Sequence, residues 1–184
     1  MIEPRVISRI HHAAYRCRDA EQTRWFYEDV LGLRLRAALA FDHLPGSEES
    51  RRYMHLFFEL GNGGFIAFFD SPEDATPAHF ERKDSFDVHV ALEVDGEEAL
   101  LAMQKRIQSY GKSCLGPVDH GFVQSCYMYD PNGLQVEITT MTSNHDEVMA
   151  HEQTVSRSSI ANWSKETRAH KLALFGTDAL DKRA

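Results

Sequence analysis

The sequence contains few cysteines, no surplus of positive charge and no long apolar run. Its 184 residues include only Cys17, Cys114 and Cys126. These are widely spaced and form no CxxC pair, so neither a disulfide framework nor a thiolate zinc site is indicated. The sequence has 20 Lys and Arg residues and 28 Asp and Glu residues, which gives a net charge of −8. This balance disfavours a nucleic-acid partner, because no positive excess is left to neutralise phosphates.

The sequence also shows no pattern typical of a membrane span or a signal peptide. No stretch reaches the roughly 18 consecutive apolar residues that a membrane span requires, and the first residues contain no apolar core typical of a signal peptide. Hydrophobic residues at 42% and charged residues at 26% are ordinary globular values. We therefore expect a cytoplasmic globular protein whose partner is a small molecule, without nucleic-acid or membrane partners.

An internal repeat organises the chain. The strand-like segment HAAYRC, which begins at His12, is matched by HVALEV, which begins at His89. Each is followed by a helical pattern that opens on a capping Asp and closes on a Gly, over residues 19–32 and 95–111. Three strand-like runs follow each helix, at 33–41, 53–60 and 65–69 in the first half and at 113–115, 125–129 and 134–139 in the second.

The repeat predicts an α+β protein made of two tandem βαβββ modules, residues 7–75 and 86–142. After the second module, residues 143–184 carry apolar positions at helical spacing, which predicts a helical appendage. We expect this appendage to serve packing or dimerisation. Because tandem modules leave strand edges that natural sheets pair or cover, we also expect a homodimer.

Three residues of metal-ligating type fall on equivalent faces of the predicted strands. Side chains alternate along a strand, so His12 and His89 take matching inward positions in the two modules. In the last strand, Glu137 lies on the face opposite Val136 and Ile138. Two histidines and one carboxylate form a set with open coordination positions that is most typical of non-haem Fe(II).

Residues 12–19, 26–33 and 129–137 resemble the vicinal oxygen chelate superfamily, which includes glyoxalase I, bleomycin-resistance proteins and extradiol ring-cleaving dioxygenases. The resemblance covers residues 7 to about 142. It implies that the modules curl into a cup-shaped open barrel around a divalent metal, Fe(II) first, with Mn, Ni, Co or Zn as alternatives. His12, His89 and Glu137 match the family's ligand positions.

The repeat also shows which residue of the first module is equivalent to Glu137, and this residue distinguishes between branches of the superfamily. Glyoxalase I enzymes place a fourth ligand, a glutamate, at the position that Ala67 takes here. The three-ligand set therefore favours an extradiol-type dioxygenase that acts on a catechol-like substrate with adjacent oxygens. A glyoxalase-type lyase or isomerase is the alternative, and it needs a second carboxylate, for which Glu59 is the nearest candidate. A non-catalytic protein that sequesters an antibiotic or metabolite is the third interpretation.

Two further residues are candidates for catalysis. The hairpin turn at Asp130–Gly133 predicts that Tyr127 pairs with Glu137, a position resembling that of the tyrosine that contacts the diol in extradiol dioxygenases. A half-buried sheet tyrosine is the alternative reading. His120 precedes this strand and is a candidate acid–base residue or a surface loop residue, as is His79. We expect no convergent partners for the remaining histidines, His11, His43, His55, His145, His151 and His170, and we expect His11 to face away from the metal.

Overall fold

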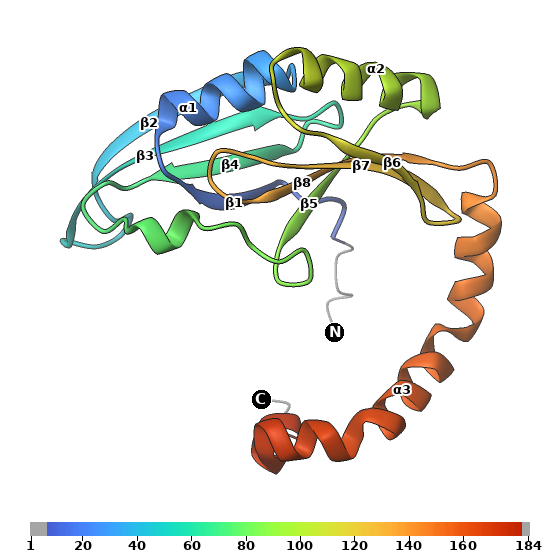
Figure 1. Ribbon diagram of the computed structural model, residues 1–184. Helices are drawn as coiled ribbons and strands as arrows, with labels where there is room; N and C mark the ends of the chain where they lie inside the picture. Colours follow the sequence, from blue (N-terminus) through green and yellow to red (C-terminus); the bar gives the residue numbers. More distant parts are fainter. Residues whose placement is uncertain (1–6, 182–184) are drawn as a thin grey trace. The chain divides into compact units, whose positions relative to one another are not determined.

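The computed structural model describes residues 7–181, which form two four-stranded sheets and the helices that accompany them (Figure 1). The first half contains β1 (His12–Cys17), α1 (Ala20–Arg24), the π-helical η1 (Trp25–Val30), β2 (Arg34–His43), β3 (Ser50–Glu59), β4 (Phe65–Asp70) and the 3-10 helix η2 (Pro77–Phe80). The second half contains β5 (His89–Glu93), α2 (Gly96–Ser109), β6 (Leu115–Asp119), β7 (Val123–Tyr129) and β8 (Gln135–Met141).

The two sheets have the same topology. Their strand orders are β1-β4-β3-β2 and β5-β8-β7-β6, and in each the first strand runs parallel to the last while the other pairs are antiparallel. This is the arrangement that two tandem βαβββ modules predict, so the α+β fold class is confirmed. Both sheets stay open among the described residues, and neither closes into a barrel.

The hydrophobic core lies between the helices and one face of each sheet. Phe26, Tyr27 and Val30 are fully buried against β3 and β4, as the helical spacing after Asp19 predicts. In the second module Leu100 and Ile107 of α2 pack in the same way. Both helices lie on the same side of the sheets (Figure 1). The opposite face of each sheet, here called its open face, therefore carries the side chains that alternate with the core.

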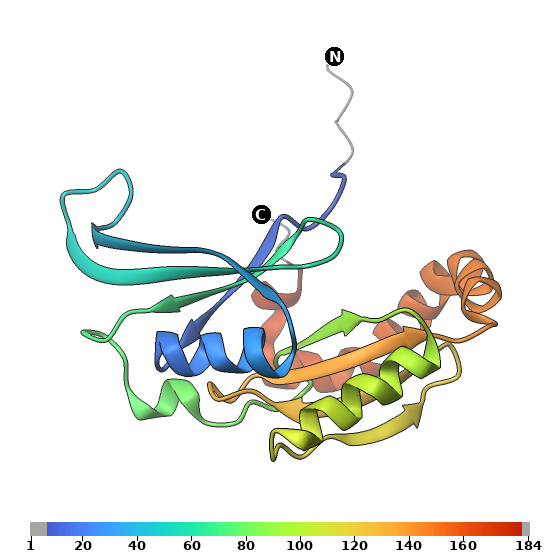
Figure 2. The ribbon, with the colours of Figure 1, turned by 90° about the horizontal axis from the view of Figure 1, so that it is seen from above.

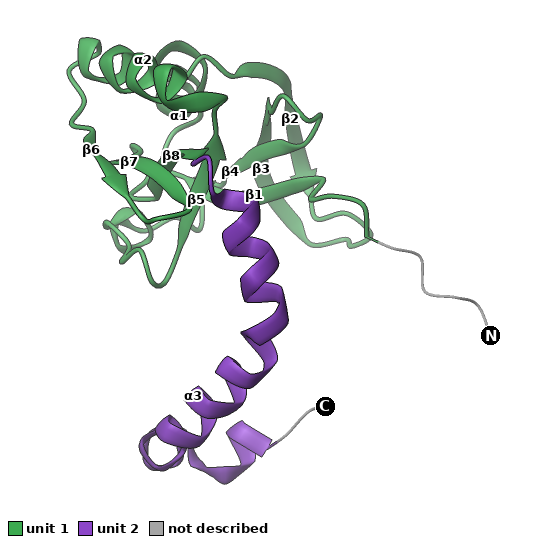
Figure 3. Cartoon of the chain, turned by 90° about the vertical axis from the view of Figure 1, so that its right-hand side faces the viewer, with its two compact units in different colours: residues 1–141 green, residues 142–184 purple. Residues whose placement is uncertain are grey.

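The modules contact each other through η1, α2 and one turn, and both belong to a single compact unit, residues 1–141 (Figures 2 and 3). The Arg106 guanidinium donates hydrogen bonds to the carbonyls of Val30 and Asp29, both at 2.7 Å. The buried Tyr27 hydroxyl donates to Asp130 Oδ2 at 3.1 Å. These bonds cross between sequence-distant segments and fix the first module against the second.

Several element boundaries differ from those predicted. The weak strand expected at residues 113–115 is β6, Leu115–Asp119, which contains Gly116 and Pro117 and has an irregular register between Leu115 and Val118. Proline and glycine mask the strand pattern, and an edge position tolerates both. The runs predicted at 33–41 and 53–60 correspond to β2, which continues to His43, and β3, which already begins at Ser50. The helical pattern predicted over residues 95–111 ends earlier, because α2 stops at Ser109, before the exposed Tyr110.

Residues 142–184 form the second unit, and its described part is α3, His145–Asp181. The helix carries a non-helical residue at Gly176, where φ is 76°. Along residues 145–181 no side chain is buried, and Trp163 and Ile160 are largely exposed. Within residues 7–181 no helix combines the length and apolar character that a membrane span needs.

The three cysteines are free and buried. Burial is the main cause that raises the pKa of the Cys17 thiol to about 12. The thiol therefore stays protonated and packs as a small apolar group.

Candidate metal and substrate site

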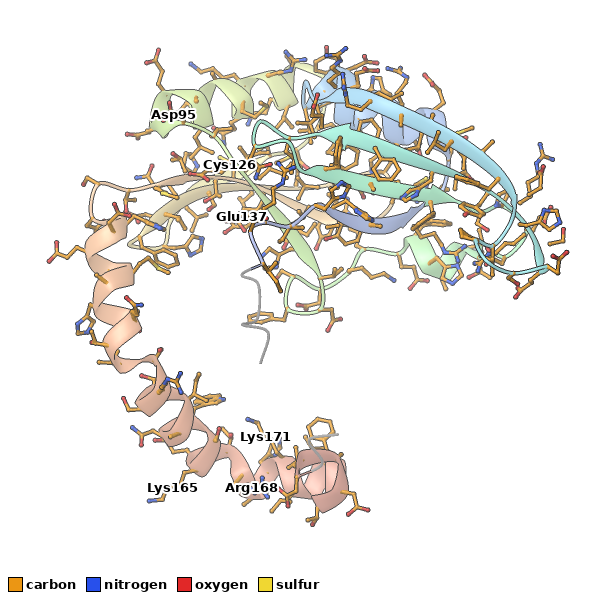
Figure 4. All side chains as sticks on the ribbon, turned by 180° about the vertical axis from the view of Figure 1, so that it is seen from behind. Asp95, Cys126, Glu137, Lys165, Arg168 and Lys171 are labelled. Carbon is orange, nitrogen blue, oxygen red and sulfur yellow. The ribbon has the colours of Figure 1, made fainter. Side chains whose placement is uncertain are left out.

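His89 and Glu137 lie beside each other on the open face of the second sheet. Parallel pairing sets Ala91 opposite Glu137 on the neighbouring strand, and His89 precedes Ala91 by two residues on the same face. His89 Nε2 is 3.7 Å from Glu137 Oε2. Glu137 points away from the face that holds α2 and Cys126 (Figure 4). The strand alternation predicts this orientation, because Val136 and Ile138 fill the core on the other side.

Neighbouring groups orient both side chains. His89 Nδ1 donates to the Ser85 carbonyl at 2.8 Å, so Nε2 carries the lone pair and faces Glu137. Ser125 Oγ donates to Glu137 Oε1 at 2.5 Å, which leaves Oε2 on the histidine side. A backbone carbonyl on the second ring nitrogen and a hydroxyl on the second carboxylate oxygen are the supports that metal ligands ordinarily have.

Tyr127 and His120 extend the same open face. The ladder pairs Tyr127 with Glu137, as the hairpin at Asp130–Gly133 predicts, and Gly133 has the left-handed φ of 81° expected of that turn. The Tyr127 hydroxyl lies 2.7 Å from His120 Nε2. Desolvation is the largest cause that raises the pKa of Tyr127. The tyrosine therefore remains a neutral phenol that can donate its proton to the imidazole.

His12 lies on the corresponding open face of the first sheet, apart from His89 and Glu137. Its ring contacts Phe57 and His55, with ring centroids 5.6 and 6.1 Å apart. Among residues 7–181 there is no group of three His, Cys, Asp or Glu side chains placed to hold a metal ion. One chain thus presents the predicted ligand set in two parts, with His12 on one sheet and His89 with Glu137 on the other.

Two expectations about the other histidines are wrong. His11 precedes the first residue of β1, so strand alternation does not turn it away, and its Nδ1 lies 2.9 Å from His12 Nδ1. His55 has convergent neighbours, because the antiparallel pairing of β3 with β4 places it opposite Phe69 on the face that carries His12. The uncertain length of β3 in the sequence hid this register.

The supporting residues Ser85 and Ser125 were not singled out by the sequence. Ser125 is two residues before Tyr127 and shares its face, so the alternation that located Tyr127 also contains the signal for Ser125. Ser85 lies in the segment between the modules, where no periodic pattern predicts which carbonyl turns toward His89.

The first module offers no carboxylate equivalent to Glu137. Ala67 pairs with Ala14 on β1 as Glu137 pairs with Ala91 on β5, so Ala67 takes the equivalent position. Glu59 shares the open face but lies across β4 from β1, and it forms an ion pair with Arg36 at 3.5 Å. The predicted donor set of His12, His89 and Glu137 contains two imidazoles and one carboxylate, a combination that suits a divalent transition metal with open positions.

Comparison with known proteins identifies a family for most of the chain. Residues 9–138 match the family model of the glyoxalase/bleomycin resistance protein/dioxygenase superfamily. No curated protein sequence matches the chain.

Several solved structures share the fold. A glyoxalase/dioxygenase from Nostoc punctiforme is 24% identical, with 74% of this chain and 92% of that chain covered and a TM-score of 0.55. The fosfomycin resistance protein FosX from Listeria monocytogenes, complexed with Mn(II) and sulfate, is 18% identical, with 77% and 98% covered and a TM-score of 0.54. The antibiotic-binding protein TnmS3 from Streptomyces sp. CB03234 is 19% identical, with 76% and 100% covered and a TM-score of 0.50.

These similarities include enzymes and binding proteins, so they identify the fold and the superfamily rather than one reaction. The family model spans both βαβββ modules and ends within β8, one residue after Glu137. The chain belongs to the glyoxalase/bleomycin resistance protein/dioxygenase superfamily.

Proposed function

We propose that the protein is a metal-dependent ring-cleaving dioxygenase of the extradiol type that acts on a catechol-like vicinal diol. The observation that carries the proposal is the arrangement on one open face, where His89 and Glu137 lie beside the Tyr127–His120 pair. Ala67 in the equivalent position of the first module leaves three ligands rather than four, which favours this reaction over a glyoxalase-type one.

His12 of a second copy would complete the ligand set. His12 is exposed on its own sheet, as are the small residues Ala14 and Ala91 in the middle of their strands. In a two-fold dimer, the open face of the first sheet of one copy can meet the open face of the second sheet of the other. Two-fold symmetry would then create two identical sites.

Fe(II) is the metal we propose, because two histidines and one carboxylate are the set typical of non-haem iron oxygenases. When bound, the metal would supply Lewis-acid activation of the diol and a template for both reactants. Glu137 would offset the charge of the cation and fix its position through the bond from Ser125. FosX, which shares the fold, is complexed with Mn(II), and Mn, Ni, Co and Zn are the competing metals.

The protein's own residues would then move one proton. The Tyr127 hydroxyl would orient a diol oxygen by a hydrogen bond and accept its proton. His120 Nε2, 2.7 Å from the Tyr127 hydroxyl, would accept the phenol proton in turn. Such positioned proton transfer commonly contributes about 10²-fold or more to a rate.

Activity after anaerobic loading with Fe(II) tests the reaction assignment. We expect about one metal ion per chain, since two copies would form two sites, and the conversion of some catechol to a yellow ring-cleaved product. Inactivity of the iron-loaded protein toward a broad panel of diols would reject the dioxygenase. Conversion of a glutathione hemithioacetal would identify the lyase alternative, and loss of all metal on dialysis would favour a binding protein.

A further inference from the structure

A cavity of about 450 Å³ lies on the open face of the first sheet, and one of its walls is His55, whose ring centroid is 6.1 Å from that of His12. Its walls include aromatic side chains of β2, β3 and β4 and two arginines, with Arg16, Phe41, Arg51, Tyr53, His55 and Phe69 as the main contributors. The volume lies within the range of small-molecule sites. A larger cavity of about 610 Å³ lies where the β3–β4 turn approaches β5, and its walls contain none of the proposed metal ligands.

The two arginines make one end of the 450 Å³ cavity positive. Arg16 Nη1 and Nη2 donate to the two carboxylate oxygens of Asp74 at 2.7 and 3.3 Å, and Arg51 forms an ion pair with the same carboxylate. The hydrogen bond from Arg16 is the largest cause that holds the pKa of Asp74 well below its ordinary value. Two guanidinium charges against one carboxylate leave a net charge of about +1 at this end.

Arg51 retains donors for a second anion. A guanidinium carries about five N–H donors in a planar fork, and Asp74 engages Arg51 through one nitrogen, Nη2. Planar forks bind carboxylates in particular, because two parallel N–H groups match the two oxygens. The end of the cavity therefore suits one additional carboxylate.

The middle of the cavity is apolar and flat-walled. The His55 ring stacks on Phe69 with centroids 3.9 Å apart and planes 24° apart, and Tyr53 stacks on Phe41 at 5.1 Å. Among the described residues His55 Nε2 has no hydrogen-bond partner and is buried. Stacked rings of this kind offer an aromatic ligand large contact area and little polar competition.

His55 links the cavity wall that holds the arginines to His12. His12, Ala14 and Arg16 alternate along β1 on one face, so His12 and Arg16 are separated by about 13 Å along the strand. His55 is level with Arg16, because both residues pair with Phe69, and its ring centroid is 6.1 Å from that of His12. Ala14 is exposed between His12 and Arg16 and its small side chain leaves the floor open.

We propose that the substrate is an aromatic vicinal diol that also carries a carboxylate. This inference rests on the proposed function for the diol end, whereas the acid end rests on Arg16, Arg51 and the stacked rings. The diol would reach the metal position at His12, the ring would lie along His55 and Phe69, and the carboxylate would bind the Arg51 fork. A neutral catechol would reach the metal position and the rings but would make no ionic contact with Arg51.

Calorimetric binding of dihydrocaffeate and of its methyl ester tests the acid end without turnover, on anaerobic protein loaded with Fe(II). We expect wild-type protein to bind the acid more tightly than the ester. Arg51→Gln should lower affinity for the acid by about tenfold or more, the effect typical of a lost charge-assisted hydrogen bond, and should leave affinity for the ester unchanged. Arg51→Lys, which keeps the charge, should retain most of the preference.

Arg52→Gln is the matched control, because the next residue of β3 is exposed and outside the cavity walls. Equal affinity of wild-type protein for acid and ester, or an equal loss in the Arg52 variant, would overturn the subsite. Cleavage of catechols without any preference for the acid would reject the subsite and keep the reaction. An Arg51-dependent preference for the acid without cleavage of either compound would support the subsite and reject the reaction.

Discussion

Glu137 supplies the negative charge in the proposed ligand set. Glu137→Gln keeps size and hydrogen-bonding capacity but removes that charge, so it should greatly reduce metal occupancy. A cation that binds only the folded state stabilises it by about 2.7 kcal/mol at a hundredfold excess over its dissociation constant. We therefore expect the melting-temperature shift on metal addition to vanish in this variant.

Glu93→Gln is the control for this measurement. Glu93 is exposed on the same sheet, two pairs away from Glu137 along β5. The Glu93→Gln variant should keep the wild-type melting-temperature shift on metal addition. If Glu137→Gln kept the shift and Glu93→Gln lost it, the ligand assignment in the second module would be wrong.

We expect Tyr127 and His120 to affect the rate of catechol cleavage and not the amount of metal bound. Tyr127→Phe removes the hydroxyl that faces His120 Nε2, so catechol cleavage should fall by about a hundredfold while metal content stays at the wild-type level. Steady-state kinetics with metal analysis measures both. Because the two groups form one relay, His120→Ala should add little to the loss in Tyr127→Phe.

Tyr129→Phe is the matched control on the same strand. The Tyr129 hydroxyl donates to the Lys83 carbonyl at 3.2 Å and lies outside the relay. A similar loss of cleavage in both tyrosine variants would assign Tyr127 a structural role.

For single residues, the sequence predicts the sheet face on which a side chain lies better than it predicts the groups that contact that side chain. Alternation along the strands located Glu137 and Tyr127 on one face, and the turn at Gly133 fixed their pairing. The partners of His89 and His12 depend on segments without a regular period. The Ser85 carbonyl and the His11 ring both belong to such segments, so a strand pattern contains no information on them.

Among the elements, the turn after β7 joins the two modules most directly. Tyr27 of η1 donates its buried hydroxyl to Asp130. Tyr27→Phe leaves that acceptor with one partner fewer, and we expect a loss of about 1–2 kcal/mol in the free energy of unfolding. Urea denaturation measures the loss. Tyr15→Phe, which removes a half-buried hydroxyl from the first module alone, should cost less, and the reverse order would contradict this role for the turn.

Asp130 should also make the stability depend on pH. Desolvation by burial is the largest cause that raises the pKa of Asp130 in the folded protein. The folded state then holds its proton more tightly than the unfolded state, so stability falls as pH rises from about 4 through the raised pKa. Asp130→Asn should remove this part of the slope in urea denaturation measured across that range. An unchanged slope would show that other groups cause it.

The element pattern was predictable where hydrophobic periodicity was regular. The helix that begins after Asp19 buries Phe26, Tyr27 and Val30 as its spacing predicts, and Asp19 accepts a hydrogen bond from the Gln22 amide. Strand β6 was misplaced because Gly116 and Pro117 interrupt its pattern at an edge, where tertiary pairing rather than local preference defines the strand.

In the whole molecule, strand alternation does not determine whether the ligands of one metal site come from a single chain or from two copies of the chain. His12 and His89 take equivalent positions, and either one chain or two could bring such positions together. In this chain the modules pack through η1, α2 and the turn at residues 130–133, while His12 remains apart from Glu137. The contact between modules is a tertiary property that sheet-face alternation does not contain.

We propose that each metal site takes His12 from one copy and His89 with Glu137 from another. In that arrangement, His12→Ala and His89→Ala alone should each lose metal. A mixed dimer of the two variants would combine both substitutions in one site and leave the other site intact. Light scattering must first show a dimer, since a monomer of 21.0 kDa would already contradict the claim.

The metal content of the two variants, after they are unfolded together, refolded and loaded with Fe(II), shows whether two copies share a site. Equal amounts should give mixed dimers in about half of the population, and each would have one intact site of two, so we predict recovery of about a quarter of the wild-type metal. Each variant refolded alone should recover almost none. Recovery in the mixture no greater than in the separate variants would contradict a site shared between copies.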